Sequence, residues 1–333
     1  MNKKALAGVG LVIGILAIYY ILRTIPIKEV LILISNARFS AIAGYAVSSL
    51  IIMFVLAWRW SLILKSQNHH VGMIRLILYR LVGYGVSYLT PSAKLGGEPI
   101  RAALLSKHGR SFSESLSSVV IDKTIEVASH ALFFFIGALI ILFRFALPEQ
   151  TEITMLLFAI AFLAFIIFIY KRMVSGKGVI ASTCRFFRLN KFKKIKKSEK
   201  KIEQFEQLII KFFKHDKRDF FMAVILSFFS WVFMFFEYWF IGKMIGYDLS
   251  FPTIFLMTTV VGIAFLIPIP MALGSLEAGQ VMVFNLTRGP GSSVAGMAVS
   301  FITRARDLLW SLLAILLLFY FGIGQTFFKK KKL

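Results

Sequence analysis

The stretch that decides the fold is residues 73–107, MIRLILYRLVGYGVSYLTPSAKLGGEPIRAALLSK. Its first half is apolar enough for a membrane helix, and Thr90-Pro91 then interrupts it. The segments on its two flanks, 59–75 and 101–110, carry Lys and Arg, which membrane proteins retain on the cytoplasmic side. Because a single crossing cannot return the chain to its starting side, we expect a re-entrant hairpin that turns at Thr90-Pro91 and comes back through 96–107.

The composition agrees with a membrane protein. Of the 333 residues, 58% are hydrophobic and 17% are charged, against roughly 25% charged in soluble domains. Such a chain cannot cover a water-exposed surface, which excludes a soluble enzyme and a disordered protein. A lone cysteine, Cys184, excludes a disulfide framework, and the histidines lack metal-ligand spacing. We therefore expect neither a metal nor another cofactor.

The number of crossings follows from apolar length and from the placement of positive charge. A bilayer core of about 30 Å needs about 20 apolar residues as a helix. The stretch 171–218 carries sixteen Lys or Arg and four acids, so we place it in the cytoplasm together with both termini. Residues 251–290 must then start and finish outside, and they form a second hairpin that folds at Pro268-Ile269-Pro270. Full spans are expected at 5–22, 39–58, 117–143, 153–170, 220–245 and 295–323.

The two hairpins resemble each other, which indicates an internal repeat. A proline precedes a glutamate by seven residues in both, as Pro91 to Glu98 and Pro270 to Glu277. Each hairpin leads into a long helix with buried charge, Asp122-Lys123-Thr-Ile-Glu126 in one case and Thr303-Arg304-Ala-Arg-Asp307 in the other. We expect one all-α transmembrane domain of six full helices and two opposed re-entrant hairpins. It consists of two inverted repeats, 1–143 and 153–325; chance similarity is the alternative.

Charged side chains inside spans are functional candidates, because they are costly in lipid. Asp122, Glu126 and His130 share one helix face, and Lys123 should find a partner other than Asp122. Glu277 either pairs with Arg304, carries a proton or caps its helix. The alternative is that these residues only lock helices together. The candidate binding residues are Lys94, Glu98, Arg101, Asp122, Lys123, Glu126, Glu277, Arg304 and Asp307, and the candidate hinges are Pro91, Gly96, Gly97, Pro268, Pro270 and Gly274.

Two further segments carry predictions. Residues 198–214 place Phe205, Ile209 and Phe212 on one face and lysines elsewhere, which predicts an amphipathic helix on the inner leaflet. Glu237, within Phe-Phe-Glu-Tyr-Trp, is expected at the outer membrane interface among its aromatic neighbours. No nucleic-acid-binding motif accompanies the basic segment, so nucleic acid is not an expected partner.

The motifs resemble those of a known family. The string Pro91-Ser-Ala-Lys-Leu-Gly-Gly97-Glu98-Pro-Ile-Arg101, and Pro268-Ile-Pro270-Met-Ala-Leu-Gly274-Ser-Leu-Glu277 with Arg304, are similar to the signatures of the flippase-like family. That family includes the membrane region of lysylphosphatidylglycerol synthases. Asp122-Lys123 stands where the family usually has Glu-Arg, and Lys cannot clamp a phosphate bidentately. The resemblance implies lipid movement between leaflets; with no aminoacyl-transfer domain after the membrane region, lipid aminoacylation is not expected.

We therefore expect a lipid translocator in the inner (cytoplasmic) membrane, with a polar cavity between the hairpins. Arg101, Lys123 and Arg304 would hold the headgroup of an anionic or aminoacylated phospholipid or a polyprenyl-phosphate lipid. The carboxylates would balance these cations and couple movement to protons. Gly289-Pro-Gly291 lacks the Lys and Ser/Thr of a nucleotide-binding loop. The alternatives are a lipid-modifying transferase with Glu98 or Asp122 as base, and a non-transporting partner of a lipid synthase; a homo-oligomer is also possible.

Overall fold

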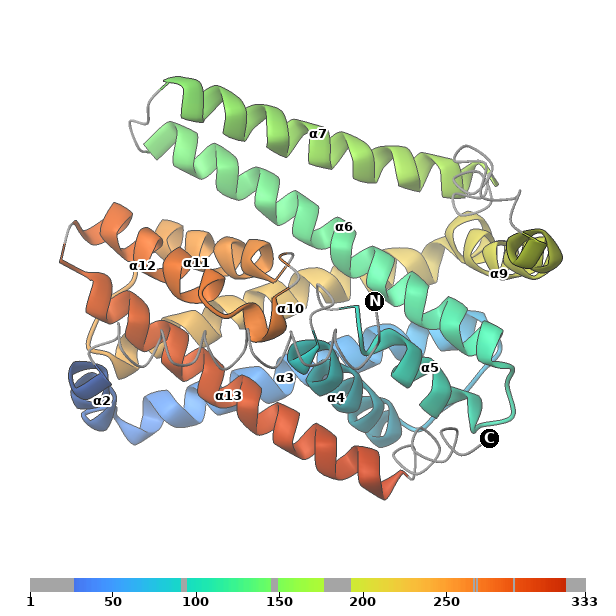
Figure 1. Cartoon of the computed structure of the whole chain (residues 1–333), viewed down its shortest axis with the longest axis horizontal. Coiled ribbons are helices and arrows are strands. Elements are labelled where there is room, and N and C mark those ends of the chain that lie inside the picture. The colour runs from blue at the N-terminus through green and yellow to red at the C-terminus, as the bar shows by residue number, and fades with distance from the viewer. Residues whose placement is uncertain are drawn as a thin grey trace. The chain divides into compact units, whose positions relative to one another are not determined.

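A computed structural model describes residues 27–90, 95–144, 149–176, 193–265, 267, 269–289 and 291–321 (Figure 1). These residues form helices and no strand. The elements are α2 (Ile27–Ser35), α3 (Phe39–Ser66), α4 (Met73–Leu89), α5 (Glu98–Ser106), α6 (Phe112–Arg144), α7 (Glu149–Val174), α9 (Lys193–His215), α10 (Lys217–Met244), α11 (Phe251–Ala264), the short η2 (Pro270–Ala272), α12 (Ser275–Arg288) and α13 (Ser293–Tyr320).

Three helices in the described part of the chain are long and apolar enough to cross a membrane. They are Phe39–Ser66, Phe112–Ile140 and Lys217–Met244, and they contain most of the predicted spans 39–58, 117–143 and 220–245. The predicted spans 153–170 and 295–323 fall on α7 and α13, whose crossing remains a prediction. The predicted span 5–22 lies outside the described residues.

The long helices leave apolar faces uncovered by protein. On α10 the exposed residues recur three, four or seven positions apart, which places them on one side of the helix. They include Phe221, Ile225, Val232, Phe236 and Trp239, and Met222, Phe228 and Phe229 widen the same exposed surface. Helix α13 has a similar exposed series in its second half, Leu308, Leu312, Leu316 and Phe319. Exposed apolar patches of this extent are typical of a surface that contacts lipid.

The described helices pack into two compact units. Unit 1 consists of Met1–Met53, Leu78–Ile100 and Ser230–Leu333, and unit 2 consists of Phe54–Ile77 and Arg101–Phe229. Helices α3, α4, α5 and α10 each contribute residues to both units. These units are not the predicted repeats 1–143 and 153–325, and the duplication stays a prediction.

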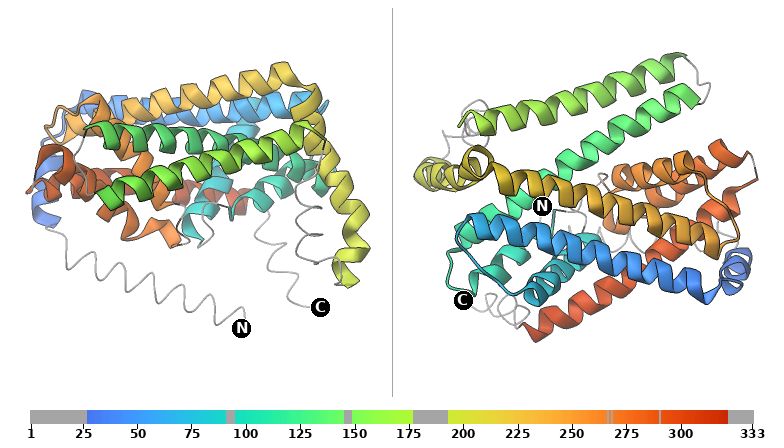
Figure 2. Two further views of the ribbon diagram at one scale, coloured as in Figure 1. Left: turned by 90° about the horizontal axis from the view of Figure 1, so that it is seen from above. Right: turned by 180° about the vertical axis from the view of Figure 1, so that it is seen from behind.

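Unit 2 is built on α6, which lies beside α7 along much of its length (Figures 1 and 2). Helix α9 packs against both of these helices. Its residues Ile209, Phe212 and Phe213 are buried against Ile121 and Ile125 of α6. The expectation that this amphipathic helix rests on the lipid leaflet is therefore wrong for its apolar face. Protein core covers that face, with Phe205 partly buried at its edge.

Unit 1 contains the second predicted hairpin, in which α11 and α12 pack together. The Ser250 hydroxyl accepts a hydrogen bond from the Thr253 amide and so caps the start of α11. The turn between the helices holds Met271 at a φ of 56° and Gly274 at a φ of 81°, before α12 begins at Ser275. Left-handed residues within this short turn make the predicted hinge at Pro270 and Gly274 a sharp bend. The left-handed conformation costs conformational energy at Met271, whereas glycine adopts it readily. Pro268 lies outside the described residues.

The first predicted hairpin depends on a close backbone approach. Helix α4 ends at Leu89, directly before the predicted turn. After the turn, the Gly97 amide donates to the Ser87 hydroxyl at 2.8 Å. A Cβ on Gly97 would lie 1.9 Å from the Gly83 carbonyl oxygen, so no other residue fits at this position without movement. Glycine at 97 thus brings the chain back against α4, with Gly96 beside it, whereas Pro91 and Lys94 lie outside the described residues.

Candidate functional site

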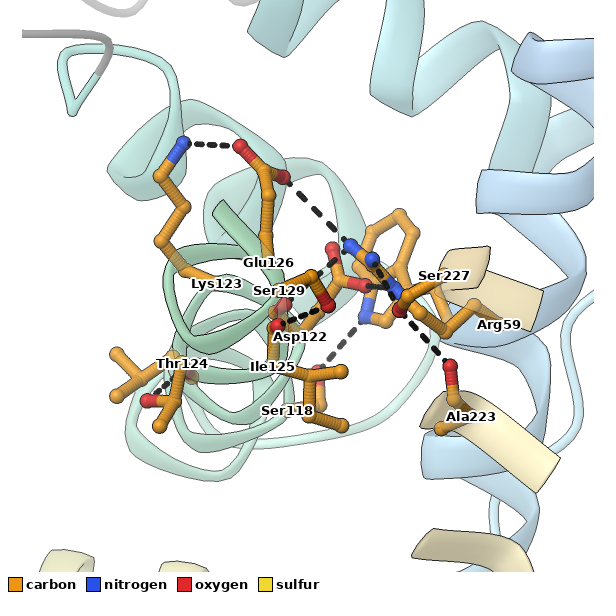
Figure 3. Close-up of polar contacts among 12 residues, drawn as sticks. Arg59, Ser118, Asp122, Lys123, Thr124, Ile125, Glu126, Ser129, Ala223 and Ser227 are labelled. Atoms are coloured by element: carbon orange, nitrogen blue, oxygen red, sulfur yellow. Dashed lines mark hydrogen bonds and ion pairs between the residues drawn. The ribbon is translucent and has the colours of Figure 1, made fainter. Parts of the chain in front are cut away.

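Asp122 on α6 is the centre of a buried ionic cluster in unit 2 (Figure 3). Its carboxylate accepts at both oxygens, with Arg59 Nε 2.8 Å from Oδ1 and Arg101 Nη2 2.8 Å from Oδ2. The two guanidinium side chains are 1% and 6% exposed, and Asp122 is fully buried. Charges removed from water to this degree need a partner, so one carboxylate stabilises two arginines from two other helices.

Further contacts fix the two arginines. Arg59 Nη1 donates to the Ser227 hydroxyl of α10 at 3.0 Å, and the Arg101 guanidinium lies 4.2 Å from the ring centroid of Trp60. The Trp60 indole in turn donates to the Ser118 hydroxyl at 3.2 Å. A guanidinium stacked on an indole keeps its planar donors aligned.

The sequence-based placement of Arg59 in a cytoplasmic connection is wrong. Helix α3 continues to Ser66, so Arg59 lies inside a helix and its side chain is buried. Tryptophans on both sides of it, at positions 58 and 60, were the available signal. An arginine between two tryptophans is typical of a side chain that packs against aromatic rings. Two tryptophans are not expected in a connection that is exposed to water.

Lys123 and Glu126 form the edge of this cluster. Lys123 Nζ lies 2.7 Å from Glu126 Oε1, and Glu126 Oε2 lies 3.6 Å from Arg59 Nη2. Their side chains are 15% and 22% exposed, much more than that of Asp122. Figure 3 shows Glu126 between Lys123 and the Arg59 guanidinium. The prediction that Lys123 pairs with a residue other than Asp122 is consistent with this contact.

We name Arg59, Arg101, Asp122, Lys123 and Glu126 the arginine cluster. These ion-paired residues comprise three cations and two carboxylates, a formal charge of +1. In addition, the buried Arg101 Nε has no hydrogen-bond acceptor among the described residues. A buried donor without an acceptor is unfavourable, and an anion would supply the missing acceptor.

Unit 1 contains a second cluster, centred on Arg306 of α13. Arg306 donates through Nε and Nη2 to Asp307 Oδ1, at 2.9 and 2.8 Å, and through Nη1 to Glu237 Oε1 of α10 at 2.6 Å. The Tyr84 hydroxyl of α4 also donates to Asp307 Oδ1, at 2.7 Å. Glu237 additionally accepts from the Ser49 hydroxyl of α3. Here one guanidinium holds two carboxylates.

Glu277 of α12 and Arg304 of α13 form the other part of this cluster. Arg304 contacts both carboxylate oxygens, with Nη2 2.7 Å from Oε2. It also donates to the Met271 and Ala272 carbonyls, at 2.8 and 3.3 Å, in the turn before α12. Glu277 accepts from the Gly274 amide at 2.9 Å. Two alternatives predicted for Glu277 are therefore both true: it pairs with Arg304 and it caps its helix. Together the two side chains bind the polar backbone that the turn exposes.

Stacked tyrosines connect the two parts of this cluster. The rings of Tyr84 and Tyr88 are 6.2 Å apart and nearly parallel, and Arg304 Nη1 lies 3.5 Å from the Tyr88 hydroxyl. We name Glu237, Glu277, Arg304, Arg306 and Asp307 the acidic cluster. It comprises two cations and three carboxylates, a formal charge of −1.

The structure thus divides the predicted site residues between two clusters. Arg101, Asp122, Lys123 and Glu126 meet in unit 2, whereas Glu277, Arg304 and Asp307 meet in unit 1. Glu98 is the first residue of α5 and is half-buried. The described residues contain no group of three or more His, Cys, Asp or Glu that could hold a metal.

Sequence reasoning missed several members of these clusters. Glu237 was expected at the membrane interface among its aromatic neighbours, which stays a prediction, but its partner was not expected: its side chain is 2% exposed and paired with Arg306. Arg306 was visible as the second cation of Arg304-Ala-Arg-Asp307, but only the first was selected. Tyr84 gave no signal, because a tyrosine in an apolar helix is common and its partner Asp307 is more than 200 residues away.

Comparisons with known proteins identify a family of membrane proteins. The family model described as "Lysylphosphatidylglycerol synthase TM region" matches residues 8–320. A UPF0104 membrane protein of Methanothermobacter thermautotrophicus is 25% identical over 311 residues, 89% of each chain. A UPF0104 membrane protein of Pyrococcus horikoshii is 25% identical over 85% of this chain and 87% of its own, and one of Methanocaldococcus jannaschii is 23% identical over 87% of each. The chain belongs to the family of the lysylphosphatidylglycerol synthase transmembrane region.

Proposed function

We propose that this protein moves a phosphate-bearing lipid between the two leaflets of the cytoplasmic membrane. The observation that carries the proposal is the buried Nε donor of Arg101, which has no acceptor among the described residues and belongs to a cluster of three cations and two carboxylates within an apolar helical unit. A phosphate that approaches Arg101 would meet its Nε donor and the ammonium group of Lys123 on the more exposed side. The acyl or prenyl tails would remain against the apolar faces of the helices.

The arginine cluster is better suited to binding than to acid–base catalysis. Both oxygens of Asp122 accept hydrogen bonds from guanidiniums, at 2.8 Å each. A general base must reach the proton that it removes, and these contacts occupy the carboxylate. The contacts of Asp122 therefore favour transport over the alternative in which it is the base of a lipid-modifying transferase.

The proposal includes two hairpins that enter the membrane without crossing it. Helices α11 and α12 have 14 residues each, which at 1.5 Å per residue is about 21 Å, less than the bilayer core of about 30 Å. Helix α5, with nine residues, is shorter still. Helices of this length joined by a bend fit partial entry, and polar backbone at such bends suits a substrate path. The proposed topology also has six full transmembrane helices and places both termini in the cytoplasm.

The transport proposal is tested by leaflet exchange in unilamellar vesicles. Phosphatidylglycerol with a fluorescent headgroup-proximal label is distributed in both leaflets, and an impermeant reductant quenches the outer one. We expect the inner-leaflet lipid to move to the outer leaflet, where the reductant destroys its label, in vesicles that contain the protein and not in empty vesicles. Lys123→Gln should slow exchange, because it removes the more exposed cation of the arginine cluster. Lys243→Gln is the matched control, since Lys243 is exposed and outside both clusters. Exchange equal to that of empty vesicles would exclude the proposal.

The topology is tested by labelling single cysteines with an impermeant maleimide after Cys184→Ser. We expect Lys107→Cys, after α5, to react from the cytoplasmic side, and Asp248→Cys, between α10 and α11, to react from the outside. Both cysteines reacting from the same side would exclude the arrangement of spans and hairpins. The assay does not depend on transport, so it separates a wrong topology from a wrong function.

A further inference from the structure

Asp307 is held asymmetrically within the acidic cluster. All three of its side-chain contacts, one from Tyr84 and two from Arg306, fall on Oδ1. Oδ2 is buried and accepts no hydrogen bond among the described residues. The residue itself is fully buried. An ionised carboxylate oxygen in such a place lacks the donors that normally stabilise it.

The groups that face Asp307 do not supply the missing positive charge. Arg306, on the same helix, divides its donors between Asp307 and Glu237. The other facing groups are tyrosines and the second acid, and they are contributed by three helices. They are Tyr45 of α3, Tyr84 and Tyr88 of α4, and Glu237 and Tyr238 of α10. Tyrosines are neutral, so the single guanidinium of Arg306 faces two carboxylates.

A second polar atom near this triad also has no partner. The Tyr45 hydroxyl is buried and makes no hydrogen bond among the described residues. Its ring lies 5.9 Å from the Arg306 guanidinium carbon. The Arg306 side chain is 21% exposed, which gives the triad a connection to the surface of its unit.

We propose that the Glu237–Arg306–Asp307 triad binds one proton, at Oδ2 of Asp307, and that proton binding is linked to lipid movement. In this step a hydronium ion from the aqueous phase transfers one proton to Oδ2 and becomes water, the carboxylate becomes a carboxylic acid, and no bond between heavy atoms changes. The charge of the triad goes from −1 to zero, and that of the acidic cluster does the same. Oδ2 is the oxygen at which the proton adds, because Tyr84 and Arg306 occupy Oδ1 and the buried Oδ2 accepts no hydrogen bond among the described residues.

The link to lipid movement rests on the proposed function, whereas proton binding does not. A proton taken up by unit 1 is a ligand of a different class from the phosphate expected in unit 2. The two can be measured separately, which makes failure of one distinguishable from failure of the other.

Proton binding is tested by infrared spectroscopy of the purified protein during a pH titration. As pH falls, the wild type should gain a carboxylic-acid C=O band at the high frequency of an acid that is shielded from water. Asp307→Asn should lose this band, and Glu277→Gln, the control within the same cluster, should keep it. Tyr84→Phe is a second variant that leaves Asp307 in place: it removes one donor to Oδ1 and should shift the band without abolishing it. No band in the wild type, an unchanged band in Asp307→Asn, or loss of the band in Glu237→Gln alone would overturn the assignment to Asp307.

The link is tested in the vesicle exchange assay at a series of pH values. Wild-type exchange should depend on pH through the same range in which the infrared band develops, and Asp307→Asn should lose that dependence. If the band is present and wild-type exchange is independent of pH, the triad binds a proton but the link is wrong. If no exchange occurs while the band is present, the transport proposal fails and the proton site stands.

Discussion

The two ionic clusters have the same components in opposite arrangement. In unit 2 a carboxylate is central and binds two guanidiniums, Arg59 and Arg101 around Asp122. In unit 1 a guanidinium is central and binds two carboxylates, Glu237 and Asp307 around Arg306. Counted over the named residues alone, the formal charge is +1 in the arginine cluster and −1 in the acidic cluster. The difference shows why the formal charge of a buried ionic network matters. A network with more cations than carboxylates favours an anionic ligand, and one with more carboxylates than cations favours a proton or a cation.

The same reversal is visible beside the two bends. After the first bend, the helix α5 supplies a cation, Arg101, to an acid on α6. After the second, the helix α12 supplies an acid, Glu277, to a cation on α13. In both cases a short helix is tied to the long helix that follows it. The predicted repeat would account for this similarity in position, and the exchange of sign would be a later divergence.

The largest expected effect on stability comes from replacing an aspartate by asparagine, a change that can be made once in each cluster. Asp122→Asn leaves two buried guanidiniums without their shared carboxylate and should lower the free energy of unfolding by about 3–5 kcal/mol. Asp307→Asn keeps an acceptor for Tyr84 and leaves Arg306 paired with Glu237, so it should cost about 1 kcal/mol or less. Denaturation of the purified protein in detergent measures both values. Equal losses for the two variants would contradict the assigned charges.

A smaller effect is expected at the first bend, where packing and not charge is tested. Gly97→Ala would place a Cβ 1.9 Å from the Gly83 carbonyl oxygen, and the helices would have to separate. Overpacking of this kind costs about 1–3 kcal/mol. Gly72→Ala is the matched control, because nothing lies within 4 Å of its added Cβ. Thermal unfolding should show a lower midpoint for Gly97→Ala alone, and similar midpoints would mean that the bend does not need this close approach.

The role of the indole in unit 2 gives a third test. Trp60→Phe removes the donor to Ser118 and weakens the cation–π contact with Arg101. We expect a loss of about 1 kcal/mol in unfolding free energy, since each of these contacts contributes about that much or less. Trp58→Phe is the control, because Trp58 is exposed and its ring contacts only Phe54 among the ring contacts described. Equal losses of unfolding free energy for the two substitutions would mean that Trp60 does not stabilise the buried Arg101 side chain.

The smallest effect concerns His69, in the connection between α3 and α4 of unit 2. Desolvation lowers the pKa of His69 from 6.5, and the positive charge of Arg110 lowers it further. The folded state therefore favours neutral His69. The contribution of neutral His69 to the free energy of unfolding is fully present above pH 6.5, the pKa of histidine in the unfolded chain. It is lost as pH falls through the lower pKa that His69 has in the folded protein. His69→Gln should flatten the acid side of a plot of unfolding midpoint against pH. An unchanged slope would indicate that protonation of His69 does not oppose folding.

Much of the fold followed from the sequence, because the signals are local. Apolar length located α3, α6 and α10, and the bend at Pro270 and Gly274 was located by its own residues. The pairing of Glu277 with Arg304 was also within reach, since both follow the same bend. The contacts of Arg59 and Glu237 were not, because they depend on helices distant in the chain. Charge counting assigned Arg59 to water, although a buried carboxylate elsewhere in the chain neutralises it.

The most direct test of the central claim is selectivity for the phosphate group in leaflet exchange. Vesicles that contain the wild-type protein are loaded with labelled phosphatidylglycerol in one series and, in another, with a labelled glycolipid of the same acyl chains and no phosphate. We predict that the protein accelerates exchange of the phospholipid and leaves the glycolipid near the rate in protein-free vesicles. Acceleration of both lipids to the same extent, or of neither, would contradict the claim that the cations of the arginine cluster select the transported headgroup.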